Sequence, residues 1–415
     1  GERAEDQLEY LITQMTAESD EFDVLGLDTI WPAQFAENGW IEDLSASPYS
    51  VTDEELSDYF GGMVDSGKYD GKTWAYPYFM SLGVLFYRKD ILHRNGFNVT
   101  DLATWESFND TLNTILANVT ELTMEPDLVG HVGQFDAYEG GVVNFMEWLG
   151  SGGQTTIFDE DGNANLNNSD AQETLEFLKA LVAPRFTVVN NSDAIIPRSA
   201  LTMDEGSSVG KWLAGETICM RQWPFAYDNT ISTEALNATD GSGNYTQFGI
   251  TRMPTKAGAT NPKSSAVGGA VLAISTYSNH KEEAMNLIRF LGDKVAQEYE
   301  LTKLSNFPAL KSVFDTPPSG YEWISSFKSA AESTLSRPVH PKYPQISNEI
   351  ADKFSDLLSG VKSVPQALGE MDEAINEIIA GGATEARIPG YPVGIFAVAS
   401  LCAIGIVALL LRKKR

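Results

Sequence analysis

Aromatic side chains occur in loop contexts at four places, each next to a short apolar run or a glycine-rich segment. They are Trp31-Pro32 after the run 23–27, Tyr76-Pro77-Tyr78-Phe79 before the run 83–87, Phe145 to Trp148 before 150–153, and Trp223-Pro224 after the run 217–220. Flat aromatic faces beside Asp, Arg and glycine backbone suit a sugar, because its C–H faces stack while its hydroxyls need fixed hydrogen-bond partners. Each of these side chains could instead fill a core. Four clusters at the ends of predicted strands favour a shared binding surface.

The motifs of common enzymes are absent from the sequence. It has no G-x-S-x-G, H-E-x-x-H, Cys-x-x-Cys, P-loop or G-x-G-x-x-G pattern, and its four His residues are not spaced as metal ligands. We therefore expect no metal, no cofactor and no catalytic residue. Acids suited to glycan hydrolysis are abundant among the 57 Asp and Glu residues. A surface-anchored glycan hydrolase or transferase that uses acids such as Asp28 therefore stays the alternative.

The charge of the chain is strongly negative. The 415 residues carry a formal charge of −28, and the sequence pI is about 4.4. Such a surface repels phosphate backbones, so we expect no nucleic-acid partner. The length is that of two lobes rather than of one compact core.

The C-terminal segment differs from the rest of the chain. Residues 388–411 contain no Lys, Arg, Asp, Glu or His, and four basic residues, 412–415, follow at once. A helix of that length spans a bilayer core of about 30 Å. Basic residues favour the cytoplasmic side. We therefore predict a transmembrane helix at 388–411, a cytoplasmic tail at 412–415, a linker at 381–387 and an extracellular, monomeric ectodomain before it.

Two weaker signals agree with an extracellular location. Glycosylation sequons occur at Asn98, Asn109, Asn118, Asn167, Asn190, Asn237 and Asn244. One cysteine, Cys219, lies in the predicted ectodomain and the other, Cys402, in the membrane segment, so no internal disulfide is expected. The sequence begins at Gly1 without a secretion leader, and we expect it to lack its natural start.

Strand-like and helix-like patterns alternate along the chain. The apolar runs 23–27, 83–87, 217–220, 248–250 and 270–274 predict strands, and the periodic segments 8–15, 169–182, 280–292, 346–359 and 364–380 predict helices. This alternation is typical of α/β layers with parallel sheets.

The motifs and their order resemble those of extracellular solute-binding proteins of ABC importers, in the branch for trehalose, maltose and related sugars. The resemblance rests on 23–40, 76–78, 85–92, 158–162, 220–227, 267–269, 337–338 and 343–347. A C-terminal anchor resembles archaeal binding proteins more than free periplasmic ones.

The resemblance implies a periplasmic-binding-protein type II fold of two α/β lobes. Lobe I would comprise 1–80 and 262–304, and lobe II 81–261 and 305–380. The chain would cross a hinge near 79–82, 261–268 and 301–307. A carbohydrate would bind between the lobes and close them, and an ABC permease would read the closed form.

The resemblance also implies which residues contact the sugar. Asp28 would accept from hydroxyl groups, Trp31 would line the cleft, Trp223 would stack on a sugar ring, Arg337 would donate to sugar oxygens, and Gly269 would offer backbone groups. The flanking motifs add Tyr78, Phe79, Ser81, Trp148, Gly153 and Tyr343.

Several positions depart from the pattern of sugar-binding relatives. Gln7 replaces an Arg, Ser81 an Asp, Phe79 a Tyr, and Ala270 the Trp that follows Gly-Gly. Losing one hydrogen-bond partner costs about 1–3 kcal/mol. The sequence therefore predicts a carbohydrate-binding receptor but leaves open the sugar or polyol that it binds.

Overall fold

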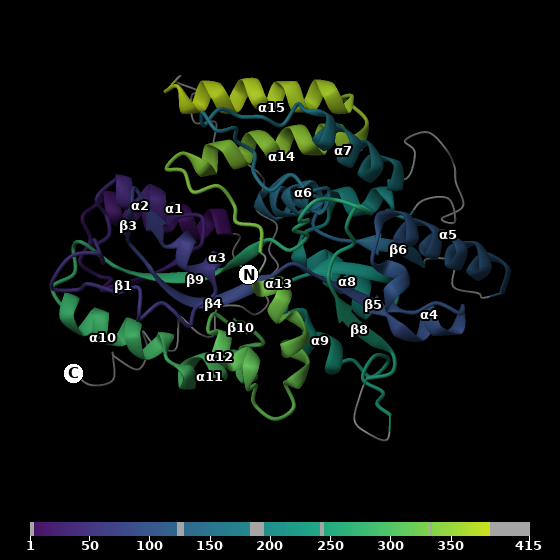
Figure 1. Ribbon diagram of the computed structural model, residues 1–415, viewed down its shortest axis with the longest axis horizontal. Helices are drawn as coiled ribbons and strands as arrows, with labels where there is room; N and C mark the ends of the chain where they lie inside the picture. The colour runs from purple at the N-terminus through teal and green to yellow at the C-terminus, as the bar shows by residue number, and fades with distance from the viewer. Residues whose placement is uncertain (1–3, 123–127, 183–194, 241–244, 333, 382–415) are drawn as a thin grey trace.

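A computed structural model describes residues 4–122, 128–182, 195–240, 245–332 and 334–381. Its strands form two four-stranded sheets and a small hairpin within those ranges. We call the part of the chain packed around each large sheet a lobe. Lobe I lies on the left of Figure 1 and lobe II on the right, with α14 and α15 along the top.

The sheet of lobe I has the order β1-β9-β4-β10. Its strands are β1 Val24–Asp28, β4 Tyr76–Leu82, β9 Val267–Ile274 and β10 Phe307–Pro308, and a hairpin of β2 Lys68–Tyr69 and β3 Lys72–Thr73 lies apart from it. The helices of this lobe are α1 Ala4–Thr16, α2 Pro32–Glu37, α3 Gly61–Ser66, α10 Lys281–Gly292, α11 Lys294–Leu304, α12 Lys311–Asp315, η4 Glu322–Phe327 and α13 Lys328–Glu332.

The sheet of lobe II has the order β6-β7-β5-β8. Its strands are β5 Val84–Arg88, β6 Val129–Val132, β7 Thr217–Gln222 and β8 Phe248–Thr251. The helices are α4 Lys89–Arg94, η1 Val99–Leu102, α5 Trp105–Leu122, α6 Glu139–Ser151, α7 Ser169–Leu181, η3 Arg198–Thr202, α8 Glu205–Leu213, α9 Ala226–Ile231, α14 Tyr343–Ser359 and α15 Val364–Ile379.

Local sequence signals account for several of these elements. The side chain of Asn168 accepts from the backbone N–H groups of the first turn of α7, and Ser363 does the same for α15. Gly360 ends α14 with a φ of +80°, in the left-handed region that glycine adopts readily. Every residue of β7 is buried, because β7 lies between β6 and β5 in the sheet and α8 packs against it.

The expectation of parallel sheets is wrong for most of the described strands. Of the pairs between named strands in the described ranges, β6 with β7 is parallel and the others are antiparallel. The cause is that the chain passes from one lobe to the other and back. Strand β4 leaves lobe I for lobe II and β9 returns, so the two pair with opposite directions.

Three connections between the lobes lie side by side in the described chain. The backbone N–H of Gly83 donates to the carbonyl of Ala266 at 3.4 Å, and Val267 donates to Leu335 at 2.9 Å. The second connection falls within the predicted 261–268, and the first lies just beyond the predicted 79–82. The third passes through Leu335 and not through 301–307, because Phe307 pairs with Met80 in the sheet of lobe I. The boundary expected at 304/305 is displaced for the same reason.

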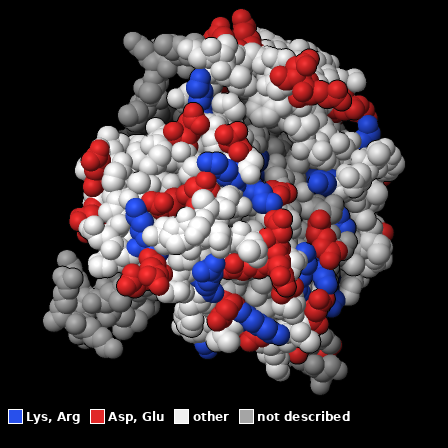
Figure 2. Space-filling model, turned by 60° about the vertical axis from the view of Figure 1, so that its left-hand side comes forward, with Lys and Arg blue, Asp and Glu red and all other residues white. Residues whose placement is uncertain are grey.

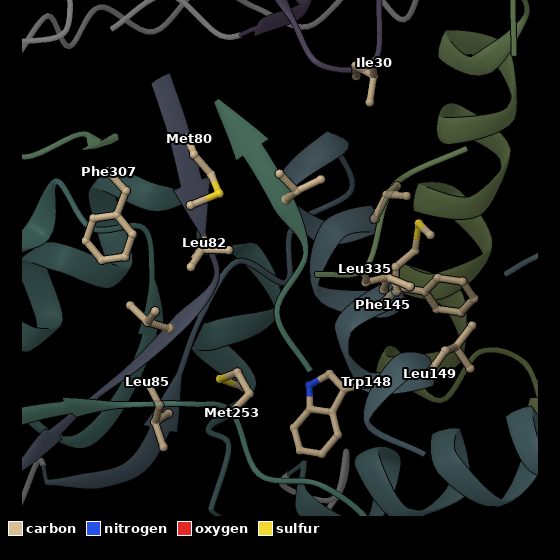
Figure 3. Packing of buried hydrophobic residues seen from close by; sticks show 14 of the residues in the cluster. Ile30, Met80, Leu82, Leu85, Phe145, Trp148, Leu149, Met253, Phe307 and Leu335 are labelled. Atoms are coloured by element: carbon tan, nitrogen blue, oxygen red, sulfur yellow. The ribbon is translucent and has the colours of Figure 1, made fainter. Parts of the chain in front are cut away.

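Buried apolar side chains of both lobes belong to one cluster. Figure 3 shows the part of it around the connections, with Leu82, Leu85 and Leu335 among the labelled residues. No helix in the described ranges is long and apolar enough to cross a membrane. The predicted transmembrane helix at 388–411 and the tail at 412–415 lie outside those ranges, as does the predicted linker beyond Gly381.

Candidate functional site

The directions of the strands bring parts of both lobes to the start of β9. Asp28, the last residue of β1, lies opposite Ala270 in the register of the sheet. Trp223 follows β7 of lobe II, and a Cβ added to Gly268 would lie 3.2 Å from its indole ring. Asp28 and Trp223 therefore flank the same short stretch of β9 from different lobes.

Arg337 joins a carboxylate of lobe I to a carboxylate of lobe II. It is 6% exposed, and its Nη2 donates to Oδ1 of Asp28 at 2.7 Å and to the hydroxyl of Thr29 at 2.8 Å. Its Nη1 donates to Oε1 of Glu139, the first residue of α6, also at 2.7 Å. One guanidinium thus bridges the lobes between two carboxylates, an arrangement that we call the Arg337 bridge.

Glu139 is held by more than Arg337. The hydroxyl of Tyr343 donates to Glu139 Oε1 at 3.0 Å, and the hydroxyl of Ser347 donates to Oε2. The N-terminus of a helix also favours a negative charge at this position. Burial raises the pKa of the Glu139 carboxyl, while the positive charge of Arg337 acts in the opposite direction. Burial alone would lower the pKa of Arg337, but the carboxylates of Asp28 and Glu139 outweigh it and raise that pKa.

Trp223 forms a half-buried aromatic platform. One face lies over the guanidinium of Arg221, whose central carbon is 4.0 Å from the ring centroid. The indole Nε1 donates to Oε1 of Glu205 at 3.4 Å, and the hydroxyl of Tyr138 donates to Oε2 of the same carboxylate at 2.6 Å. The ring is therefore fixed at one face and at one edge, as a stacking platform requires.

A buried ion pair connects this platform to the links between the lobes. Arg221 and Glu147 form a two-pronged pair at 2.7 Å for each contact, and both side chains are fully buried. Glu147 Oε1 also accepts from the backbone N–H of Ala266 at 3.0 Å. A Cβ on Gly83 would lie 1.7 Å from the same oxygen, so only glycine fits there. The platform and two of the connections therefore share one polar contact.

The comparisons with known proteins agree with this architecture. The model of one family, bacterial extracellular solute-binding protein, matches residues 4–298, which is more than half of the chain. The chain belongs to this family.

Similar proteins from other organisms align with most of the chain. A "Probable ABC transporter-binding protein" of Deinococcus radiodurans is 27% identical over 361 residues, which are 86% of this chain and 79% of that one. The structure of maltose-bound MalE3 of T. maritima is 25% identical, with a TM-score of 0.74 over 90% of this chain and 89% of that one. The GacH receptor of Streptomyces glaucescens is 21% identical, with a TM-score of 0.72 over 90% and 87%. The fold is accordingly the α/β periplasmic-binding-protein type II fold.

The structure brings several predicted site residues of this solute-binding protein together. Asp28, Arg337 and Tyr343 form part of the Arg337 bridge and its surroundings. Ser81 lies opposite Gly268, beside the Trp223 platform.

Phe79 and Gly269 lie in the same stretch of sheet. Phe79 pairs with Ala270. Gly269 has a φ of +108°, and a Cβ added to it would lie 2.2 Å from the carbonyl oxygen of Phe79, which is a clash. A side chain cannot replace this glycine without moving β4.

Other predicted site residues lie elsewhere in the lobes. Trp31 is 2% exposed and packs in the core of lobe I. Trp148 is also 2% exposed, lies in the core of lobe II next to Trp105, and is labelled in Figure 3. Tyr78 donates to Glu300 of α11. Gly153 follows α6, and its backbone N–H donates to the carbonyl of Gly150 at 3.0 Å. The sequence pattern could not separate core aromatics from exposed ones, because both follow apolar runs.

Sequence reasoning missed Glu139 and Glu205, two acidic residues of the site. Glu139 and Glu205 each occupy the first turn of a helix, and Tyr138 precedes Glu139. A carboxylate in the first turn of a helix is a usable signal, but it is weak among 57 acids. Figure 2 shows how acidic residues are scattered over one face of the molecule with basic ones between them. In the described part of the chain, no group of three or more His, Cys, Asp or Glu could hold a metal ion.

Proposed function

We propose that this protein binds an uncharged carbohydrate between its lobes and delivers it to an ABC permease. The observation that carries the proposal is the placement of the Trp223 platform of lobe II and Asp28 of lobe I on either side of the start of β9. Membership of the solute-binding family supports it. The likeness to maltose-bound MalE3, at 25% identity, supports a sugar as the solute.

In this proposal the two lobes contribute different interactions. The face of Trp223 that lies away from Arg221 stacks on the C–H groups of a sugar ring. The carboxylate of Asp28, whose side chain is 24% exposed, accepts from a hydroxyl. Arg337, Ser81 and the backbone at Gly269 supply further polar contacts. Because these groups come from both lobes, the solute binds the closed arrangement of the lobes more tightly than the open one. Binding therefore shifts the equilibrium toward closure.

We further propose a membrane-tethered, monomeric receptor with its ectodomain outside the cell. The support is the composition of 388–411 and the basic residues after it. The bacterial relatives named above lend no support to the expected likeness to archaeal binding proteins.

A receptor role without catalysis is favoured over glycan hydrolysis. The family and the relatives are binding proteins. Prolonged incubation of the pure protein with a sugar that it binds, followed by mass spectrometry, separates the two roles. Recovery of intact sugar supports the receptor, and its cleavage or transfer supports the enzyme.

Binding is tested by calorimetry on the full chain in lipid nanodiscs, which avoid the sugar head groups of common detergents. The panel is maltose, trehalose, tagatose, mannitol and ribitol. We expect Trp223→Ala to weaken binding of the preferred sugar by about tenfold or more, since one stacking contact contributes roughly 1.5 kcal/mol. Tyr299→Ala is the control, because Tyr299 is 58% exposed on α11 and outside the site. No binding to any member of the panel would contradict the proposal.

A further inference from the structure

The described site has more negatively than positively charged side chains. Its cations are Arg337 and Arg221, and its carboxylates are Asp28, Glu139, Glu147 and Glu205. Arg221 is neutralised by Glu147, with both side chains fully buried. Arg337 faces two carboxylates at once. The site therefore has an excess of negative charge, and neither of these cations lacks a carboxylate partner.

Glu139 determines how much of Arg337 is available to a solute. An arginine recognises a carboxylate or phosphate best through two adjacent N–H groups. Here Nη2 is engaged by Asp28 and Thr29, and Nη1 is engaged by Glu139. Glu139 is only 12% exposed, and the hydroxyls of Tyr343 and Ser347 fix it in place. Its carboxylate thus occupies one end of the guanidinium from the side of lobe II.

Resting on the proposed function, we infer that Glu139 is a specificity-determining residue that makes the site select uncharged sugars and alditols over acidic ones. A sugar acid or phosphorylated sugar finds Arg337 already neutralised. Its negative charge is also repelled by the carboxylates of Asp28, Glu139 and Glu205. A hydroxyl group meets no such repulsion and donates to the same carboxylates.

The physical basis is the difference between a hydroxymethyl group and a carboxylate at the same carbon. Both are of similar size, so shape alone discriminates weakly. Like charges a few ångströms apart in a partly buried site repel strongly, and the solute carboxylate also loses hydration. Removing the charge of Glu139 both lowers this repulsion and releases part of the positive charge of Arg337.

The test compares matched pairs of solutes with wild-type protein and Glu139→Gln, both as the full chain in nanodiscs. The pairs are mannitol with mannonate, glucose with glucuronate, and maltose with maltobionate. We expect wild-type protein to bind the acid about 100-fold more weakly than its neutral partner. We expect Glu139→Gln, which keeps the size of the side chain and one oxygen acceptor, to narrow that ratio by about tenfold.

Two control variants separate this role from general effects. Glu205→Gln removes the same charge from the same site but leaves the Arg337 bridge intact, so we expect it to change the ratio by about threefold or less. Ser347→Ala keeps the charge of Glu139 and removes one of its hydrogen bonds, so it lowers stability without changing the ratio. An equal effect of Glu139→Gln and Glu205→Gln would overturn the inference.

The inference and the proposed function fail in different ways. If neutral solutes bind and acids bind equally well, the inference is overturned and the proposed function stands. The same holds if the affinity ratio of neutral to acidic solute is unchanged in Glu139→Gln. Thermal unfolding in glucuronate and in mannonate gives a readout that requires no neutral solute. We expect these acids to stabilise Glu139→Gln more than wild-type protein. Equal stabilisation of the two proteins would overturn the inference even if no neutral sugar on the panel binds.

Discussion

Replacing Arg337 by Met should destabilise the protein by leaving two carboxylates without their counter-charge. The Arg337 side chain is 4% exposed and that of Glu139 12%. Removing one partner of a buried ion pair costs about 3–5 kcal/mol, because the other charge stays buried and unpaired. Asp28 is 24% exposed and recovers some hydration. We therefore expect a loss of about 3 kcal/mol in the free energy of unfolding, at the lower end of that range.

A second substitution tests whether the loss comes from the stranded charge. In Arg337→Met with Glu139→Gln, the buried carboxylate is gone, and we expect about 2 kcal/mol of the loss to be recovered. The assay is urea unfolding, followed by Trp fluorescence, of the wild-type protein, Arg337→Met, Glu139→Gln and the double variant. Arg289→Met is the matched control, since Arg289 pairs with Glu55 on the surface with 41% of its side chain exposed. We expect that control to lose about 1 kcal/mol or less.

The reasoning would be refuted by either of two results. One is a loss for Arg337→Met no larger than that for Arg289→Met, which would mean that the Arg337 bridge is as weak as a surface pair. The other is additive losses in the double variant, which would mean that Arg337 and Glu139 do not interact across the lobes.

Three further predictions follow from other contacts. Gly83→Ala should lower the free energy of unfolding by about 3 kcal/mol, because its Cβ displaces Glu147 from Arg221. Urea unfolding checks this, and an unchanged midpoint would contradict it. Trp223→Ala should reduce the fluorescence change on adding maltose or mannitol, and an unaltered change would place the platform elsewhere. Burial, with the charge of Arg221, lowers the pKa of His131 from 6.5 to about 3. The contribution of uncharged His131 to the free energy of unfolding is therefore complete above pH 6.5 and is lost as the pH falls toward 3. We expect wild-type protein to lose about 2 kcal/mol more than His131→Leu between pH 7 and pH 5, and equal losses in the two proteins would refute this.

The sequence by itself determined the local elements and the family. Apolar runs located β1, β5 and β7, and apolar periodicity located α7 and α15, whose first turns Asn168 and Ser363 cap in the structure. These signals act between residues a few positions apart, so they can be read without the fold. The order of the motifs indicated solute binding, and the family match confirmed the family.

Only the tertiary structure decided which residues meet. The directions of β4 and β9, the third connection at Leu335 and the burial of Trp148 all depend on packing between segments far apart in the chain. The pairing of Arg337 with Glu139 joins residues 198 positions apart. Nothing in the sequence separates Glu139 from the many solvated acids. The proposed role of Glu139 follows from its low solvent exposure and from its ion pair with Arg337. A charge discriminates strongly between solutes only where the fold excludes water, because water screens charge interactions.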